Sequence, residues 1–315
     1  MPLLRRQAMA SLLALLPALP GHAQRRTVPA DAGEDVVVEA LKVGSARIEL
    51  QFAPGFNATQ RVLARQWVLR SANAVAAYFG RYPVNGGEIV VVPTDGSGVS
   101  GGTTFNGPPP TVRVALGRDT APARLLDDWV MVHEMVHLAI PDLPRRHNWF
   151  HEGAATYVEI IARARAGLTT ASSVWVQLPA SLHQGLPQPG DRGLDFTPSW
   201  GRTYWGGAMF CLLADVAMRQ RSQNRVGLQD ALRGLVASGS HYGVALSLEA
   251  TLKRADQVTG MAVLAELYNG MKDKPVTPDL PQLWQDLGVD IVGRSVSLRD
   301  DAPLSAVRRA ITASS

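Results

Sequence analysis

Short apolar runs separated by polar turns dominate the first 120 residues, and one long stretch of helical spacing interrupts them. Residues 36–38 and 46–52 carry the branched and alternating apolar pattern of strands. Residues 59–79 repeat apolar side chains at helical spacing, which predicts a helix of about six turns. The buried-looking run at 88–92 and the alternating run at 111–116 predict two further strands.

Two helical patterns come next, at residues 123–140 and 149–166. Pro141 and Pro144 stand between them, and proline in this position ends one helix before the next begins. The stretch from Trp129 to Ile140 is apolar except for two histidines and one glutamate. A carboxylate in such surroundings is costly unless a partner uses it. The pair of helices is therefore where we look first for chemistry.

The remainder of the chain is helical in pattern after a proline-rich connection. Ordered connections as long as the one at 167–201 are often functional. Helical spacing then recurs in five segments, at 204–220, 227–237, 246–254, 260–268 and 280–287. After a leader (1–23), we expect an N-terminal extension with strands (24–58), an α+β lobe (59–166), a long connecting loop (167–201), an all-helical lobe (202–300) and a solvated tail (301–315).

The first residues have the composition of an export signal. Arg5 and Arg6 precede a short apolar stretch, and Ala23 closes a small-residue cleavage site. The apolar stretch is shorter than the ~20 residues of a spanning helix, although a retained anchor is the alternative. We therefore expect a protein exported to the periplasm or secreted, with no stable membrane association after cleavage of the signal.

Composition narrows the function classes further. The formal charge of +4 falls to +2 when Arg5 and Arg6 leave with the signal, which gives no basis for nucleic-acid binding. Apolar residues make up 46% of the chain, enough for a sizeable core. Cys211 is the single cysteine and lies in an apolar helical run. Thiol catalysis, cysteine-rich metal sites and internal disulfides therefore have no support.

One motif carries specific chemistry, the sequence His133-Glu134-Met135-Val136-His137. On a helix, residues four apart lie on one face, so both imidazoles can reach one metal ion. Glu134 projects beside that face, where a carboxylate can take a proton from a metal-activated water. The alternative is a buried His-Glu-His cluster that binds no metal. The motif predicts one Zn²⁺ ion.

A catalytic zinc site needs a third protein ligand. A third histidine six residues after the motif would require glycine at Ile140 and histidine at Leu143, and the sequence has neither. The next helix offers carboxylates instead, Glu152 and Glu159, and His151 is a rival nitrogen ligand. His151 and Glu152 point in directions about 100° apart around that helix, so only one of the two can face the metal.

The two helices resemble the gluzincin metallopeptidases, and most of all the glycyl-aminopeptidase-like and aminopeptidase N-type catalytic domains. The resemblance implies that Glu152, in Glu152-Gly153-x-Ala155-x-Tyr157-x-Glu159, is the third zinc ligand. It also implies that the carboxylate of Glu159 holds one of the ligand histidines in place without binding the metal itself. Fourteen residues separate His137 from Glu152, fewer than in aminopeptidase N, and His151 replaces the usual asparagine.

The same resemblance suggests groups that act on the substrate. Tyr204, ahead of a Gly/Ala-rich helix, matches a tyrosine that donates to the developing oxyanion. Gly101, Gly102 and Thr103 match an edge strand whose backbone pairs with the substrate. The family's amine-binding glutamate is absent there, so terminal or internal cleavage stays open. Asp215 and Arg219 are better explained as a pair within a helix.

We expect an α+β, thermolysin-like, two-lobed metallopeptidase domain, with a mixed N-terminal lobe that bears the motif helix and an all-helical C-terminal lobe. The expected activity is hydrolysis of peptides or proteins, with Glu134 as general base. Two alternatives are an exported binding or scaffold protein that keeps the fold without catalysis, and a zinc hydrolase that cleaves a non-peptide bond.

Overall fold

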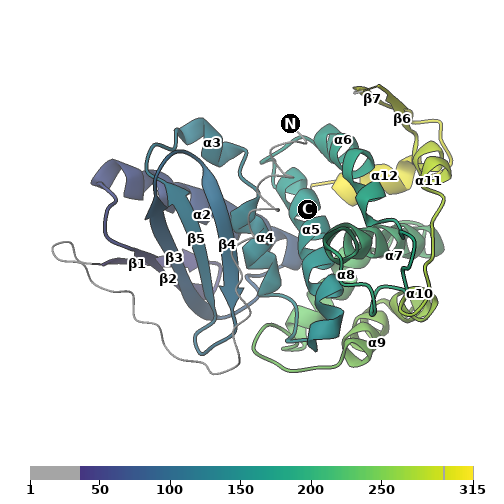
Figure 1. The fold of residues 1–315 in the computed structure, drawn as a ribbon, viewed down its shortest axis with the longest axis horizontal. Coiled ribbons are helices and arrows are strands. Elements are labelled where there is room, and N and C mark those ends of the chain that lie inside the picture. The colour runs from purple at the N-terminus through teal and green to yellow at the C-terminus, as the bar shows by residue number, and fades with distance from the viewer. Residues whose placement is uncertain (1–35, 294, 315) are drawn as a thin grey trace.

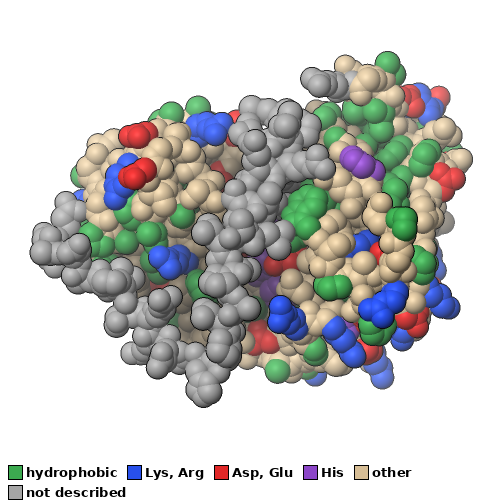
Figure 2. Space-filling model, in the orientation of Figure 1, with side chains coloured by type: hydrophobic (Ala, Val, Ile, Leu, Met, Phe, Trp, Pro, Cys, Tyr) green, Lys and Arg blue, Asp and Glu red, His purple; other side chains and the backbone are tan. Residues whose placement is uncertain are grey.

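The structure is a computed structural model that describes residues 36–293 and 295–314. A five-stranded sheet forms one side of the molecule, and most helices form the other (Figure 1). In the same orientation, acidic and basic side chains are scattered over the surface of both sides (Figure 2). The predicted signal at 1–23 lies outside the described residues. Five strands make up the sheet, β1 (Val37–Val43), β2 (Ala46–Phe52), β3 (Gly86–Thr94), β4 (Val99–Phe105) and β5 (Thr111–Gly117).

The strand order is β1-β2-β3-β5-β4, which leaves β4 at an edge. The β2–β3 and β3–β5 pairs are parallel, and the outer pairs β1–β2 and β4–β5 are antiparallel. Helix α2 (Ala58–Phe79) makes the connection that the parallel pair β2–β3 requires. Its start is fixed by a reciprocal capping box between Asn57 and Gln60, and Gly80 ends it in the left-handed conformation.

The predicted helix at 123–140 is two helices, α3 (Pro122–Leu126) and α4 (Val130–His137). The division falls at Asp128, whose carboxylate accepts the backbone N–H of Met131 at 3.1 Å and the indole N–H of Trp67 at 2.9 Å. Asp128, one residue before the N-cap Trp129, thus satisfies a backbone N–H in the first turn of α4. All eight residues of α4 are buried. The helix α5 (Asn148–Arg165) follows, as the spacing at 149–166 predicted.

The predicted connecting loop at 167–201 contains a helix, so that prediction was wrong for its first half. Helix α6 (Ala171–Leu182) is capped by Thr170 and ends in a tight turn, His183–Gly185. It forms despite Pro179 because four apolar residues at helical spacing are buried, Val174, Trp175, Leu178 and Leu182. Burial of these side chains outweighs the backbone hydrogen bond that proline removes.

The C-terminal half is helical with one exception. A π-helical turn (Arg202–Gly206) leads into α7 (Gly207–Ser222), followed by α8 (Leu228–Ala237), α9 (Leu248–Thr259), α10 (Val263–Met271) and α11 (Leu280–Leu287). The expectation of an all-helical lobe was wrong at the hairpin of β6 (Val289–Val292) and β7 (Ser295–Leu298). Four-residue strands carry too little alternation to be recognised in sequence.

The segment predicted as a solvated tail also folds. Helix α12 (Ser305–Thr312) buries Val307 and Ile311 and packs against α5 and α7. Arg308 is only 3% exposed and donates to the backbone oxygen of Gly288 at 3.0 Å. The charged residues that suggested a solvated end therefore include one that is buried. Cys211 is buried, as predicted, and none of the helices described over 36–293 and 295–314 has the length and apolarity to cross a membrane.

Candidate metal centre

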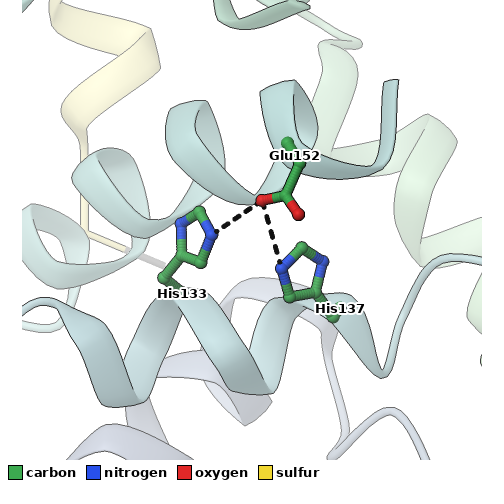
Figure 3. A group of neighbouring side chains, drawn as sticks. All are labelled: His133, His137 and Glu152. Atoms are coloured by element: carbon green, nitrogen blue, oxygen red, sulfur yellow. Dashed lines mark hydrogen bonds and ion pairs between the residues drawn. The ribbon is translucent and has the colours of Figure 1, made fainter. Parts of the chain in front are cut away.

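Helices α4 and α5 bring three side chains to one point (Figure 3). His133 and His137 lie one turn apart on α4, and both turn their Nε2 atoms toward α5. One carboxylate oxygen of Glu152 lies 3.3 Å from Nε2 of His133 and 3.6 Å from Nε2 of His137. The motif helix and the next helix thus bring the three predicted ligands close together.

This group fits a metal ion. One ligand atom from each residue lies within 4.8 Å of the other two, and both histidines are buried. Two imidazole nitrogens and one carboxylate oxygen are the donor set of catalytic zinc sites with a fourth, open position. A divalent cation could be held by these three donors, which face one another. Within 36–293 and 295–314, this is the one such group.

The protonation states suit metal ligation. Burial alone would raise the pKa of Glu152, but His137 and His133 beside it lower that pKa to about 2. Burial also lowers the pKa of His137 well below its ordinary value. At neutral pH the carboxylate is therefore charged and His137 is neutral. These are the forms that coordinate a metal.

Glu134 lies between α4 and the edge strand β4. Its side chain is almost completely buried, and burial raises its pKa to about 7. The hydroxyl of Thr104 is 2.9 Å from Oε2 of Glu134 and 2.8 Å from the backbone oxygen of the same residue. A Cβ atom on Gly102 would lie 2.5 Å from Cγ of Glu134, so only glycine allows this contact.

The edge strand presents backbone groups next to the motif. Gly101, Gly102 and Thr103 lie in β4, at the outer edge of the sheet. At Thr104 the outward backbone oxygen accepts the hydroxyl of Tyr242 at 3.2 Å. Alternation along a strand means that the backbone of Gly102 faces the same way, next to Glu134. Sequence reasoning missed Thr104 and Tyr242, because a lone threonine and a lone tyrosine carry no distinguishing pattern.

Tyr204 reaches the site from the π-helical turn. Its ring stacks against that of His133, with centroids 6.4 Å apart and planes inclined by 24°. Burial raises the pKa of Tyr204 far above its ordinary value, and the charges of Glu152 and Glu134 add to this effect. The hydroxyl therefore remains a hydrogen-bond donor at any physiological pH. A π-helical turn at this place is typical of functional sites.

The remaining candidates lie outside the group of three predicted ligands. His151 stacks on His137, with centroids 4.6 Å apart and planes inclined by 18°, and stays outside the convergent group. Glu159 is fully buried, and Arg163 lies 3.7 Å from its carboxylate. Asp215 pairs with Arg219 at 2.8 Å and accepts the hydroxyl of Tyr157 at 2.9 Å, as expected of a pair that supports helix packing.

Similar structures exist among zinc metallopeptidases, although no family model and no curated protein matches the sequence. An aminopeptidase N family protein from Idiomarina loihiensis shares 14% identity with a TM-score of 0.59, over 81% of this chain and 49% of that one. An M1 zinc metallopeptidase from Deinococcus radiodurans shares 17% identity with a TM-score of 0.52, over 78% and 53% of the two chains.

A mutant of the Deinococcus enzyme bound to the substrate Tyr-Ser-Ala matches equally well, with a TM-score of 0.51 and 16% identity. Its match covers 78% of this chain and 54% of that one. The chain thus spans about half the length of these structures. Over the matched residues it shares the fold of these structures, built from a mixed sheet and many helices.

Proposed function

We propose that this protein is a zinc-dependent peptidase with a thermolysin-like, two-lobed catalytic domain. The observation that carries the proposal is the convergence of His133, His137 and Glu152 on one point, with a buried carboxylate, Glu134, beside it. A zinc ion held by the three ligands would supply a Lewis acid that polarises a carbonyl and acidifies a water molecule. The likeness in fold to zinc metallopeptidases supports this assignment.

The acid–base work falls to Glu134. Its carboxylate accepts a proton from the attacking water and returns it to the leaving amine. Thr104 donates to the same carboxylate and fixes its rotamer, since the hydroxyl bridges side chain and backbone of Glu134. Glu134 packs against Gly102, which shields one side of its side chain from solvent.

In this proposal, backbone groups of β4 hold the substrate, and the side chain of Tyr204 stabilises the oxyanion. An extended peptide can add to the edge of the sheet at β4, where Gly102 offers backbone groups beside Glu134. The hydroxyl of Tyr204 donates to the oxygen of the scissile carbonyl as its negative charge develops. A peptide or protein substrate is supported by the tripeptide that the Deinococcus enzyme binds. Because the sequence predicts an export signal at 1–23, we place the reaction outside the cytoplasm.

One experiment tests the proposal as a whole. The purified full chain should contain about one zinc ion and should cleave members of a mixed peptide library, with loss of cleavage after chelation. Mass spectrometry of the products tells terminal from internal cleavage. Bound zinc without cleavage of any peptide would favour the binding protein or a non-peptide hydrolase. Protein that takes up no zinc would remove the basis of the proposal.

Replacing Tyr204 by Phe should lower kcat by about 100-fold and leave KM and zinc content nearly unchanged. The variant keeps the ring stacked on His133 and loses the hydroxyl, which hydrogen-bonds to Glu152 in this structure and would donate to the oxyanion of a bound substrate. Steady-state kinetics and metal analysis measure both effects. Tyr82→Phe is a matched control, because this buried tyrosine belongs to the hydrophobic core and not to the site. Equal kcat for Tyr204→Phe and wild type would exclude the role.

A further inference from the structure

The short segment 190–196, between α6 and the π-helical turn, is held in place by backbone contacts with the end of α10. The backbone N–H groups of Leu194 and Asp195 donate to the backbone oxygens of Met271 and Lys272, each at 2.9 Å, at the end of α10. Gly193 has φ of 90°, and a Cβ there would overlap the backbone of Lys272 and Lys274. We call this segment the brace.

One carboxylate of the brace holds the first turn of α5. Asp195 is 5% exposed at its side chain and accepts the indole N–H of Trp149 at 2.8 Å and the hydroxyl of Tyr268 at 2.7 Å. Nε2 of His147, the residue that precedes α5, lies 3.3 Å from the same carboxylate. Trp149 is three residues before Glu152, so Asp195 anchors the turn of helix from which the predicted metal ligand projects.

A second carboxylate of the brace holds the turn that carries Tyr204. Asp191 and Arg202 form an ion pair at 2.8 Å, and their side chains are 1% and 2% exposed. Arg202 also donates to the backbone oxygen of Gly185 at 2.7 Å. Because Arg202 is the first residue of the π-helical turn and Tyr204 is its third, this pair fixes the place of the tyrosine.

The two anchored elements touch each other without intervening side chains. A Cβ atom on Gly207 would overlap the backbone oxygen of Trp149, and one on Gly153 would overlap the backbone of Gly207. Backbone in direct contact leaves no side chain between the two elements to take up an error in position, so each element must be held by its own anchor. Catalytic groups must be held within about 0.5 Å of their productive geometry, which demands such support.

We propose that the brace positions the site through two separable contacts. Asp195 sets the metal ligand Glu152 through Trp149, and Asp191 sets the oxyanion donor Tyr204 through Arg202. Both are positioning residues, because neither is among the residues that converge on the metal position. The inference rests on the proposed function, and it predicts that the loss of each carboxylate damages a different property.

Zinc affinity tests the first contact. Asp195→Asn should weaken zinc binding by about 10-fold in a competition with a chromogenic chelator, within the range that loss of a supporting partner produces. Trp149→Phe, which keeps the carboxylate and removes one donor, should show a smaller loss in the same direction. Asp256→Asn is the matched control, because this buried aspartate also accepts two hydrogen bonds, from Leu264 and Ala265, away from the site.

Turnover tests the second contact. Asp191→Asn should bind zinc as tightly as wild type and lose about 10-fold in kcat with little change in KM, because it displaces an oxyanion donor. Adding Asp191→Asn to Tyr204→Phe should cost nothing more, since the two changes act through one hydroxyl. If Asp191→Asn does not fold, Arg202→Lys replaces it. This variant keeps a cation opposite Asp191 but loses the guanidinium that also donates to Gly185, so it should show the same loss of kcat.

The outcomes separate the inference from the proposed function. Wild-type protein that binds zinc and cleaves peptides, with Asp195→Asn binding zinc equally tightly, would overturn the first contact alone. A further loss of kcat on adding Asp191→Asn to Tyr204→Phe would overturn the second contact. In that case Asp191 would have a general structural role, whose effect on kcat adds to that of Tyr204→Phe. Wild-type protein that binds no zinc would overturn both the proposed function and the brace.

Discussion

Replacing Glu134 by Gln is expected to leave one zinc ion bound and to lower peptide turnover by about 10²–10⁴-fold, the usual contribution of a general base. The amide has nearly the shape of the carboxylate and can still accept the hydroxyl of Thr104 through its oxygen. It cannot take a proton from water. The loss should therefore appear in kcat, measured on any peptide that the wild type cleaves, with metal content determined on the same samples.

A surface acid provides the control for this change. Glu266→Gln removes a carboxylate that is exposed and paired with Arg221, so turnover and zinc content should both stay at the wild-type level. The stability of Glu134→Gln should not fall, because burial disfavours the charged form that the substitution removes. A Glu134→Gln enzyme that keeps full activity would rule out Glu134 as the base and with it the mechanism proposed above.

The long elements were predictable because each has a strong periodic signal of its own. The helix at 59–79 and the strand at 46–52 agree with α2 and β2 to within one residue. The neighbourhood of His133, His137 and Glu152 was predictable too, because spacing on one helix and the carboxylates of the next restrict where the side chains can lie. The metal itself and the catalytic roles stay predictions that the experiments above address.

Other features depend on contacts that no local pattern encodes. At the break, the carboxylate of Asp128 accepts a backbone N–H of the first turn of α4 and also the indole N–H of Trp67, which is 61 residues away in sequence. Helix α12 forms where charge suggested a solvated tail, since α5 and α7 bury its apolar face. Thr104 and Tyr242 join the site only after β4 and the loop before α9 meet. Tertiary context decides such cases over local propensity.

Replacing Glu152 by Ala is expected to reduce zinc binding by more than the ~10–100-fold that loss of a supporting partner costs, because it removes a ligand itself. Activity should fall with metal occupancy. A second readout is thermal unfolding, since a bound ion stabilises only the folded state, by about 2.7 kcal/mol at a free concentration of 100 times Kd. Added zinc should therefore raise the Tm of wild type and leave that of Glu152→Ala unchanged.

The neighbouring histidine decides whether Glu152 is the third ligand. His151→Phe keeps an aromatic ring stacked on His137 and removes both ring nitrogens, so it should bind zinc nearly as tightly as wild type. If His151→Phe loses the ion while Glu152→Ala keeps it, the three ligands are His133, His137 and His151. Glu152 would then be a hydrogen-bond partner of the ligand histidines and not a ligand itself. The geometry favours Glu152, because its oxygen lies 3.3 and 3.6 Å from the two ligand nitrogens, whereas His151 packs against the ring of one of them.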